Sequence, residues 1–466
     1  MKRRPRLDRD GYGEDQDDRH RDDGEPVVRQ LAGLFELAGA GRGDVEGLGR
    51  IPDWKALYSS VYQGHSYQPF LLIDPYDPIE ADPSHERGPI ATQMGVPVSG
   101  IFPMNGFVAN YATAKHATPP VPGSKPPVMG YFSADQAPVT DFFARNFAVC
   151  DHWHAALPAG TQPNRLMAMS GYTRIDVNKT GPIPDHYLVY DWLTQHGITW
   201  RVYHEELPFF SLLPRLIPQI IQAKNFRPFA EFFSDVENAL PGKFPQVVFL
   251  EPAYTDAPHL GLSSDDHAPS AIKGGQEFLL EVYRAIRSEP TLWSGMVAIV
   301  TYDEHGGFFD HVSPPLIATE PPPHAEYTSG PFKSLGVRVP AFVISPFVQP
   351  GTTFSGLLDH TSILKLIGEV FGDGRYLPLV DQRPVGSVLD VLADHEVHAA
   401  PNIDSLDKYR AKQAGMAGFV PGSAPDTPLQ HAFQDALDCI RAQPTRPQGK
   451  IGDLLDVFPP RPALQQ

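Results

Sequence analysis

The chain has little cysteine, no apolar run long enough to cross a bilayer, and fewer basic than acidic side chains. Its two cysteines, Cys150 and Cys439, cannot build a disulfide framework, so we expect two unpaired thiols in a reducing compartment. The lack of a long apolar run predicts no transmembrane segment. With 38 basic and 55 acidic residues, the net charge of −17 argues against nucleic acid as a partner and against passive docking on anionic lipid.

What the chain does have is enough apolar sequence for a large core, at 41% hydrophobic content over 466 residues. Its 50 prolines indicate stiff surface loops around a regular scaffold. Short β-branched or aromatic runs predict buried strands, and three- and four-residue apolar spacing predicts helices between them. The predicted strands are 198–203, 246–252, 296–303 and 339–347, and the predicted helices are 185–197, 274–289 and 359–372.

Alternation of strands and helices predicts an α/β fold with a mostly parallel central sheet sandwiched by helices. In such folds ligands bind at the carboxyl ends of the strands. Residues 1–44 differ in composition, and their first thirty have almost no apolar content, which is typical of disorder. We expect a body at 45–400, followed at 401–466 by one helix ("PLQHAFQDALDCIRAQ") and a proline-rich tail.

The stretch "TYDEHGGFFDH" directly follows one predicted strand. After the strand exit, the His-Gly-Gly turn lets Asp303 and Glu304 converge on one site, and carboxylates with imidazoles nearby suit a divalent cation. A capping Asp beside a solvated Glu explains the pair equally well. Further candidates beside strand ends or in loops favour the site, and these are His85, His204, His267, Asp359 and His360.

The second stretch is "ALPAGTQPNRLMAMSG", in which Thr161 lies in a glycine-flanked turn. Taken alone, this pattern favours a helix N-cap for the threonine. Opposite a metal ion, however, a threonine hydroxyl can lose its proton and attack phosphorus.

These segments, together with "DDHAPS" and "VRVPAFVISPFVQPG…DHTSIL", resemble a bacterial phosphoesterase family. The family includes non-specific phospholipases C and a group of acid phosphatases, and it belongs to the alkaline-phosphatase-like superfamily. The resemblance runs from about residue 45 to about residue 375 and makes 45–400 a phosphoesterase catalytic domain. It implies a phospholipase C-like phosphodiesterase acting on a phosphoester small molecule or a phospholipid head group.

The resemblance also implies roles for the site residues. Thr161 is expected to be the nucleophile and a metal ligand, with Asp303 and Glu304 holding a divalent metal ion of unknown identity. His85, His204 and His267 are expected to surround the phosphoryl group and donate protons or hydrogen bonds. Supporting roles are expected for Asn164, Arg165, His305, Asp310, His311, Asp359 and His360.

One family element is missing. The family begins with an apolar strand running into Glu-Asn-Arg-Ser-Phe-Asp, whose Glu and Asn bind the metal, whereas this chain has "DDRHRDDGEPVVRQL" at 17–31. Synonymous codons for that stretch, read one base later, give Thr-Ile-Val-Ile-Val-Met-Met-Glu-Asn-Arg-Ser-Phe-Asp-Asn. Each shifted codon allows only a few residues, so we hypothesise that the residues before roughly 32–45 are an out-of-frame reading.

Three alternatives stay open at this stage. The first is an acid phosphatase-type monoesterase, which would use the same catalytic residues. The sequence does not separate it from a diesterase, because substrate specificity lies in loops such as 205–240 and 313–335. A catalytically impaired relative or binding protein fits the missing Glu-Asn pair. A sulfatase fits less well, because that family's modification motif is not visible near the nucleophile turn. Since little chain would precede the first strand, we expect no signal peptide and a cytoplasmic enzyme, although many relatives are exported.

Overall fold

A computed structural model describes the backbone of residues 27–31 and 34–38, and the full structure of 53–72, 81–239, 242–392, 397–406 and 418–460. The segment that we interpret as out of frame, 17–31, therefore lies largely outside the described residues. At its end, β1 (Val27–Leu31) pairs with the following β2 (Leu34–Ala38) as an antiparallel hairpin. In the part of the chain that is described, no helix is long and apolar enough to cross a membrane.

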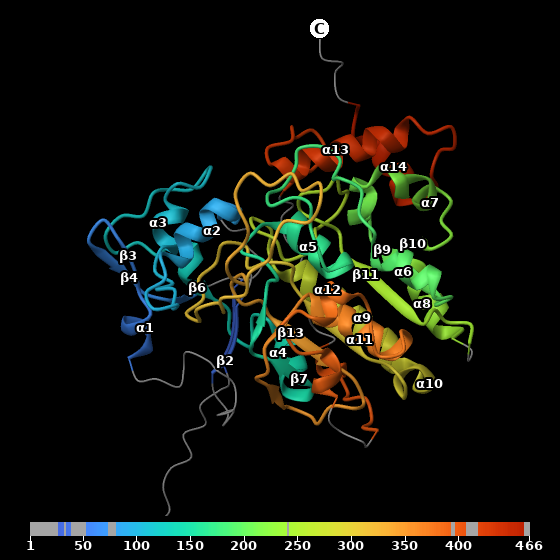
Figure 1. Ribbon diagram of the computed structural model, residues 1–466, viewed down its shortest axis with the longest axis horizontal. Coiled ribbons are helices and arrows are strands. Elements are labelled where there is room, and N and C mark those ends of the chain that lie inside the picture. Colours follow the sequence, from blue (N-terminus) through green and yellow to red (C-terminus); the bar gives the residue numbers. More distant parts are fainter. Residues whose placement is uncertain are drawn as a thin grey trace, which may run out of the picture.

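Two neighbouring sheets lie at the centre of the molecule (Figure 1). In the first, β9 lies between β10 and β11 and is parallel to both. The second has the order β12-β13-β7-β14, in which β13 is antiparallel to β12 and to β7, and β14 is parallel to β7. The strand bounds are Ser60–Tyr62 (β3), His65–Tyr67 (β4), Phe70–Leu71 (β5), Gly130–Tyr131 (β6), Ala148–Cys150 (β7), Trp153–His154 (β8), Trp200–His204 (β9), Phe226–Pro228 (β10), Val247–Glu251 (β11), Ala298–Thr301 (β12), Ala341–Ile344 (β13), Thr353–Phe354 (β14) and Leu358–Asp359 (β15).

Helices pack around these sheets, which confirms the α/β class. In Figure 1, α2 and α3 lie to the left, α9 to α12 lie to the lower right, and α13 and α14 lie at the top. Their bounds are Trp54–Leu57 (α1), Arg87–Met94 (α2), Phe107–Tyr111 (α3), Pro138–Asn146 (α4), Thr161–Ser170 (α5), Val189–Gln195 (α6), Ile217–Ile221 (α7), Phe229–Glu237 (α8), Lys273–Ser288 (α9), Pro290–Trp293 (α10), Thr361–Phe371 (α11), Pro378–Asp381 (α12), Pro428–Arg441 (α13) and Lys450–Val457 (α14).

The sheet is less uniformly parallel than the sequence pattern predicts. The described residues between β12 and β13 form loops without a named helix. A parallel return needs a long crossover, usually helical, so a strand that comes back without one pairs antiparallel. The four predicted strands and the predicted helices at 185–197, 274–289, 359–372 and 428–443 are otherwise found near their expected bounds.

The C-terminal helix α13 shows why these segments are helical. Thr427 precedes it and its hydroxyl accepts a hydrogen bond from the Gln430 N–H, while Pro428 occupies the first turn, where no N–H partner is needed. Leu429, Phe433 and Leu437 repeat at four-residue spacing and are buried in the core that also holds α5, α6 and α11. The helix is therefore part of the globular body.

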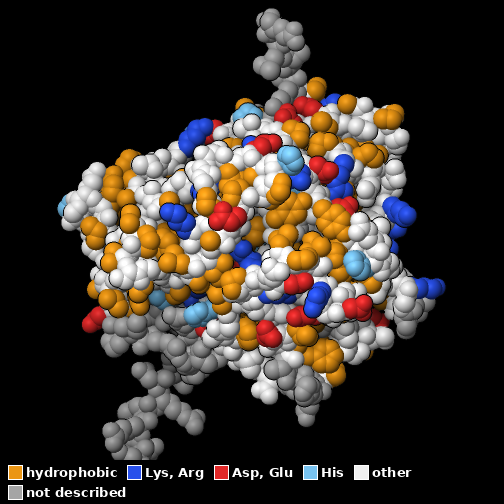
Figure 2. All heavy atoms as spheres, viewed as in Figure 1, with side chains coloured by type: hydrophobic (Ala, Val, Ile, Leu, Met, Phe, Trp, Pro, Cys, Tyr) orange, Lys and Arg blue, Asp and Glu red, His pale blue; other side chains and the backbone are white. Residues whose placement is uncertain are grey.

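The surface is chemically mixed. On the face in Figure 2, lysine and arginine side chains are scattered among acidic and apolar ones and are not gathered into one area. Both cysteines are free, as expected, with Cys150 buried and Cys439 half-buried.

A buried ion pair joins the loop after β12 to β13. Asp310 accepts hydrogen bonds from Arg338 Nε (2.9 Å) and Nη2 (3.0 Å), and Arg338 also donates to the carbonyl of Asp151. Although burial acts in the other direction, the guanidinium holds the pKa of Asp310 well below its usual range. Both groups depend on each other for charge balance in the interior.

We therefore predict that Asp310→Ala lowers the free energy of unfolding by about 3–5 kcal/mol, because Arg338 would stay buried after losing its carboxylate. Urea denaturation followed by circular dichroism measures this. The matched control is Asp404→Ala, whose exposed carboxylate lies 3.6 Å from Arg287 and which should change stability by less than about 0.5 kcal/mol. Equal losses in the two variants would contradict the structural role of Asp310.

Candidate active site

The turn after β12 explains the "DEHGG" sequence. Asp303 and Glu304 leave the strand, and Gly306 and Gly307 then adopt φ values of 61° and 76°, which side chains rarely tolerate. A Cβ on Gly307 would lie 2.8 Å from the Pro83 Cβ. The two glycines therefore let this turn pack directly against the loop before α2.

That loop brings Asp82 and His85 to His267, which lies in the loop before α9. One ligand atom from each of the three lies within 4.8 Å of the others. The His85 Nδ1 is 3.5 Å from Asp82 Oδ1, and the His85 and His267 ring centroids are 5.1 Å apart. Among the described residues this is the group of His, Cys, Asp and Glu side chains close enough to share a metal ion.

Carboxylates surround both imidazoles. Burial alone lowers the pKa of His85, but Glu304, whose Oε1 is 4.0 Å from Nε2, and Asp82 raise it to about 10. Burial also opposes the charge on His267, whose pKa is raised to about 9 by Asp82 and by Asp256, 3.9 Å away. Burial raises the pKa of Glu304. Positive charge is therefore stabilised here, whether an imidazolium or a bound cation carries it.

Thr161 opens α5, and the turn before it is held rigidly. The N-cap position belongs to Gly160, so the sequence-based expectation that Thr161 caps the helix is wrong. Asn164 reaches back from the first turn of α5. Its Nδ2 donates to the carbonyls of Leu157 and Ala159, and its Oδ1 accepts from the Leu157 N–H. Thr161 therefore stands, buried, at the start of a helix whose preceding turn is fixed.

Contacts of Gly160 place this turn beside the histidine loop. A Cβ on Gly160 would lie 3.2 Å from Glu86 Oε2 and 3.1 Å from Asn178 Nδ2. Glu86 directly follows His85 in the chain and accepts a hydrogen bond from the Asn178 N–H. Asn178 Oδ1 in turn accepts from the Gln162 N–H. The segments that carry Thr161 and His85 are thereby joined.

Arg165, one helical turn further along α5, contacts Asp303, the other acidic residue of the turn after β12. Its Nε donates to Asp303 Oδ2 at 2.9 Å, and its Nη1 donates to the Tyr254 hydroxyl at 2.8 Å. The guanidinium lies 4.6 Å from the Phe209 ring centroid and 4.7 Å from that of Tyr254. Phe209 is buried in the core, and it also supports this arginine.

His360 fixes the backbone at Asp303. Its Nε2 donates to the Asp303 carbonyl (2.7 Å), and its Nδ1 accepts from the Trp153 indole N–H (3.3 Å). Asp359 instead pairs with Arg383 and accepts hydrogen bonds from the first turn of α11. His360 thus contacts the acidic turn directly, whereas Asp359 is bonded to Arg383 and to α11.

Two predicted histidines lie apart from the group of three. At the end of β9, His204 Nδ1 donates to the Glu206 carbonyl at 2.5 Å, and burial lowers the pKa of its ring to about 4. His305 interacts through Nε2 with Gln93 Oε1 at 2.7 Å, and burial lowers its pKa to about 3. Both rings are therefore neutral near pH 7.

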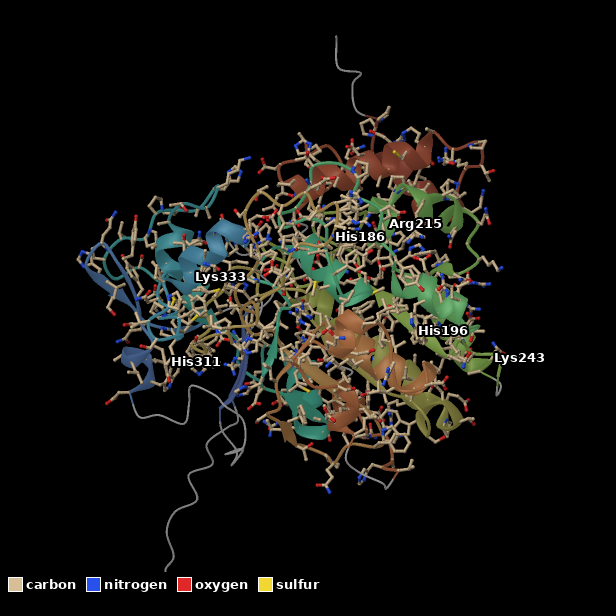
Figure 3. The ribbon with its side chains drawn as sticks, viewed as in Figure 1. His186, His196, Arg215, Lys243, His311 and Lys333 are labelled. Atoms are coloured by element: carbon tan, nitrogen blue, oxygen red, sulfur yellow. The ribbon has the colours of Figure 1, made fainter. Side chains whose placement is uncertain are left out.

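Asp310 and His311 support the loop after the acidic turn. Asp310 pairs with Arg338, and the His311 ring lies 4.7 Å from that of Tyr58, near α1 (Figure 3). The same figure labels His186 and Arg215 between α5 and α7, where Arg215 donates to the His186 carbonyl. That pair stabilises the neighbouring loops.

Sequence reasoning missed four residues of the site: Asp82, Glu86, Asp256 and Tyr254. Asp82 and Glu86 both stand in "DPSHE" with His85, so that stretch did carry a signal for two of these partners. Asp256 and Tyr254 sit in "AYTDAPH", a loop with no motif of its own, and only the folded chain brings them to the site.

The donor set fits a borderline divalent cation. Two imidazoles and several carboxylates surround one place, and such ligands suit Zn²⁺ or Mn²⁺. Asp303 lies one residue from Glu304 and is paired with Arg165. Binding of a cation requires each ligand to lose its proton.

We predict that Mn²⁺ or Zn²⁺ binds more tightly as the pH rises from about 6 to 8, because the raised pKa of Glu304 makes the cation compete with a proton for this carboxylate. Isothermal titration calorimetry in buffers of different ionisation enthalpy measures affinity and proton release. Glu304→Gln should weaken binding by about tenfold or more, whereas Glu231→Gln, a charge-matched change in the surface pair with Arg227, should not. Affinity that is independent of pH and equal in both variants would contradict this assignment.

Comparisons with known proteins find a matching family and several relatives. A sequence profile of the Phosphoesterase family matches residues 60–373. Non-specific phospholipase C3 of Arabidopsis thaliana is 32% identical over 331 residues, which cover 65% of this chain and 60% of that protein. Phospholipase C B of Mycobacterium tuberculosis is 30% identical over 305 residues, covering 56% of each chain. The chain thus spans 60% or less of the length of these two relatives.

Solved structures give weaker matches. The lipoteichoic acid synthase LtaP from Listeria monocytogenes has a TM-score of 0.33 and 10% identity, covering 69% of this chain and 76% of that one. A phosphonate monoester hydrolase of Agrobacterium radiobacter has a TM-score of 0.32 and 13% identity, covering 55% and 72%. These TM-scores are too low to support a fold assignment, so the family assignment rests on sequence. Because the profile spans the acidic turn, both histidines and Thr161, the chain belongs to the Phosphoesterase family.

Proposed function

We propose that the protein is a metal-dependent phosphoester hydrolase of the phospholipase C type, with Thr161 as nucleophile. The observation that carries the proposal is the convergence of Asp82, His85, His267 and Glu304 beside the rigid turn that presents Thr161. The relatives named phospholipases C support a diester, with a phospholipid head group or a similar small phosphoester as substrate.

The reaction is an in-line displacement at phosphorus. The Thr161 hydroxyl gives its proton to water, and its oxygen forms a bond to phosphorus while the bond to the leaving alkoxide breaks. One histidine gives its Nε2 proton to that alkoxide, and water then hydrolyses the phosphothreonine and frees the enzyme. When bound, a divalent cation would stabilise the charge on the phosphoryl oxygens and would lower the pKa of the threonine hydroxyl.

The residues of the chain divide the remaining work. Asp303 and Glu304 would hold the cation together with Thr161, and Asn164 keeps the nucleophile turn in place. The His85 Nδ1 donates to the Pro83 carbonyl at 2.7 Å, and its Nε2 lies 4.0 Å from Glu304 Oε1. His267 Nδ1 is engaged with the Ala268 carbonyl, and its Nε2 lies 3.9 Å from Asp256 Oδ2. These two rings are the proposed proton donors to the leaving oxygen.

Thr161→Ala should reduce metal-dependent hydrolysis of bis(p-nitrophenyl) phosphate and phosphatidylcholine by about 10³-fold or more, since the nucleophile is lost. Thr161→Ser keeps a hydroxyl and should retain measurable activity. Initial rates with Mn²⁺ or Zn²⁺ test this in the chain as written and in a form carrying the alternative-frame segment.

Comparison with p-nitrophenyl phosphate separates a diesterase from a monoesterase, because a phospholipase C-like enzyme should prefer the diesters. Hydrolysis that Thr161→Ala leaves unchanged, or no hydrolysis in either form of the chain, would contradict the proposal.

A further inference from the structure

Two strands at the middle of the molecule each have a partner on one side only. β11 pairs with β9, and β12 pairs with β13. Among the described strands each is the edge of its own sheet. An edge strand presents a row of N–H and C=O groups that need hydrogen-bonding partners. Here two such edges belong to the interior of one domain.

A cavity of about 970 Å³ lies between these edges, with residues 247–251 of β11 and 298–301 of β12 among its lining. Leu279, Val282 and Ile286 of α9 also line it, and so do Ile363, Leu366 and Val370 of α11. Each set follows three- and four-residue spacing, so each helix turns its apolar stripe toward the cavity. In Figure 1, α9 and α11 lie beside β11 in the lower right half of the molecule.

The strand residues themselves are less buried than central strands of an α/β sheet normally are. All four residues of β12 and the first four of β11 are partly exposed. Along β11, Val247 and Phe249 pack against one hydrophobic core, and Val248 and Leu250 pack against the other. Both faces of the sheet are therefore apolar at this position, and what is missing is a neighbour in the plane of the sheet.

One end of the cavity reaches the candidate active site. Asp303, Arg165 and His360 are among its lining residues, and so is Glu251 at the carboxyl end of β11. β12 likewise runs toward Asp303. A strand placed between β11 and β12 and parallel to them would release its carboxyl end beside the acidic turn.

The two open edges decide what kind of molecule fits. An acyl chain or another small apolar ligand would cover the side chains but would leave the backbone groups of both edges unpaired. An extended peptide can form hydrogen bonds with the backbone N–H and C=O groups of both edges, as an added strand does in other complexes. Because both faces are covered by apolar helices, its side chains must be continuously apolar.

We propose that the cavity between β11 and β12 is a strand-binding slot and that its occupant is the alternative-frame segment Thr-Ile-Val-Ile-Val-Met-Met-Glu-Asn-Arg-Ser-Phe-Asp-Asn. Its first part is an unbroken apolar run rich in β-branched residues, which suits a strand buried on both faces. Its Glu and Asn directly follow that apolar run in the sequence, so they would lie beside Asp303 and Glu304 at the carboxyl end of the strand. The written frame offers "DDRHRDDG" in its place, and the cost of burying those charges excludes it from the slot.

The test adds a synthetic peptide of the alternative-frame sequence, carried on a soluble tag, to the chain as written. Hydrogen exchange followed by mass spectrometry should show exchange of the β11 and β12 amides slowed by about tenfold or more. The melting temperature should rise with peptide concentration. A control peptide with proline at the central Ile and Val, which cannot donate from those positions, should do neither.

Absence of protection at both edges would overturn the proposal, and so would equal protection by the proline peptide or by a fatty acid. A chain in which the segment replaces residues 17–30 should show the same protection without added peptide. Sequencing of the gene across codons 1–50 tests whether the gene encodes this segment in the shifted frame. Codons that do not permit the shifted reading would overturn the named occupant.

These readouts do not depend on catalysis. The expected gain in hydrolysis on adding the peptide rests on the proposed function, whereas edge protection does not. Glu304→Gln should bind the peptide as well as the unchanged chain while hydrolysing no diester. Protection of the two edges without any Thr161-dependent activity would contradict the proposed hydrolase function but would still support the strand-binding slot.

Discussion

Close packing of the Gly306–Gly307 turn against the loop at Pro83 is the constraint on which the candidate site depends. A side chain at Gly307 would meet the proline at 2.8 Å, so only the bare backbone lets the two loops touch. That contact sets Glu304 opposite His85, and Glu86, the next residue along, meets the Thr161 turn at Gly160. Three segments far apart in sequence thus share one place because glycine stands at each close approach.

The sequence predicted the strands and helices well where apolar periodicity is strong. β9, β11, β12 and α11 lie close to their expected bounds, because a buried strand or an amphipathic helix imposes a local pattern. β13 also lies within its expected bounds, but its antiparallel direction was not predicted, since strand direction depends on how the loop before it returns. The DEHGG turn, Thr161, His85 and His267 could be proposed from the sequence because motif residues lie together in the chain.

Partners contributed by motif-free loops could not be found in the same way. Asp256 and Tyr254 act through long-range contacts with His267 and Arg165. Arg165 was expected only as a supporting residue, yet it is the charged partner of Asp303 and is held between two aromatic rings. Such roles follow from packing between elements, which no single stretch of sequence encodes.

The open edges of β11 and β12 and the charge balance of the site both indicate that a strand between β11 and β12 would complete the site. Carboxylates and imidazoles gather at the end of a sheet whose middle position lacks a strand among the described residues. The most direct measurement is a crystal structure of the chain carrying the alternative-frame segment, grown with Mn²⁺ and recorded at the manganese edge. We expect an anomalous peak bound by Asp303 and Glu304 at the end of a new strand between β11 and β12. A peak elsewhere, or an empty slot with the segment placed outside it, would contradict this account of the site.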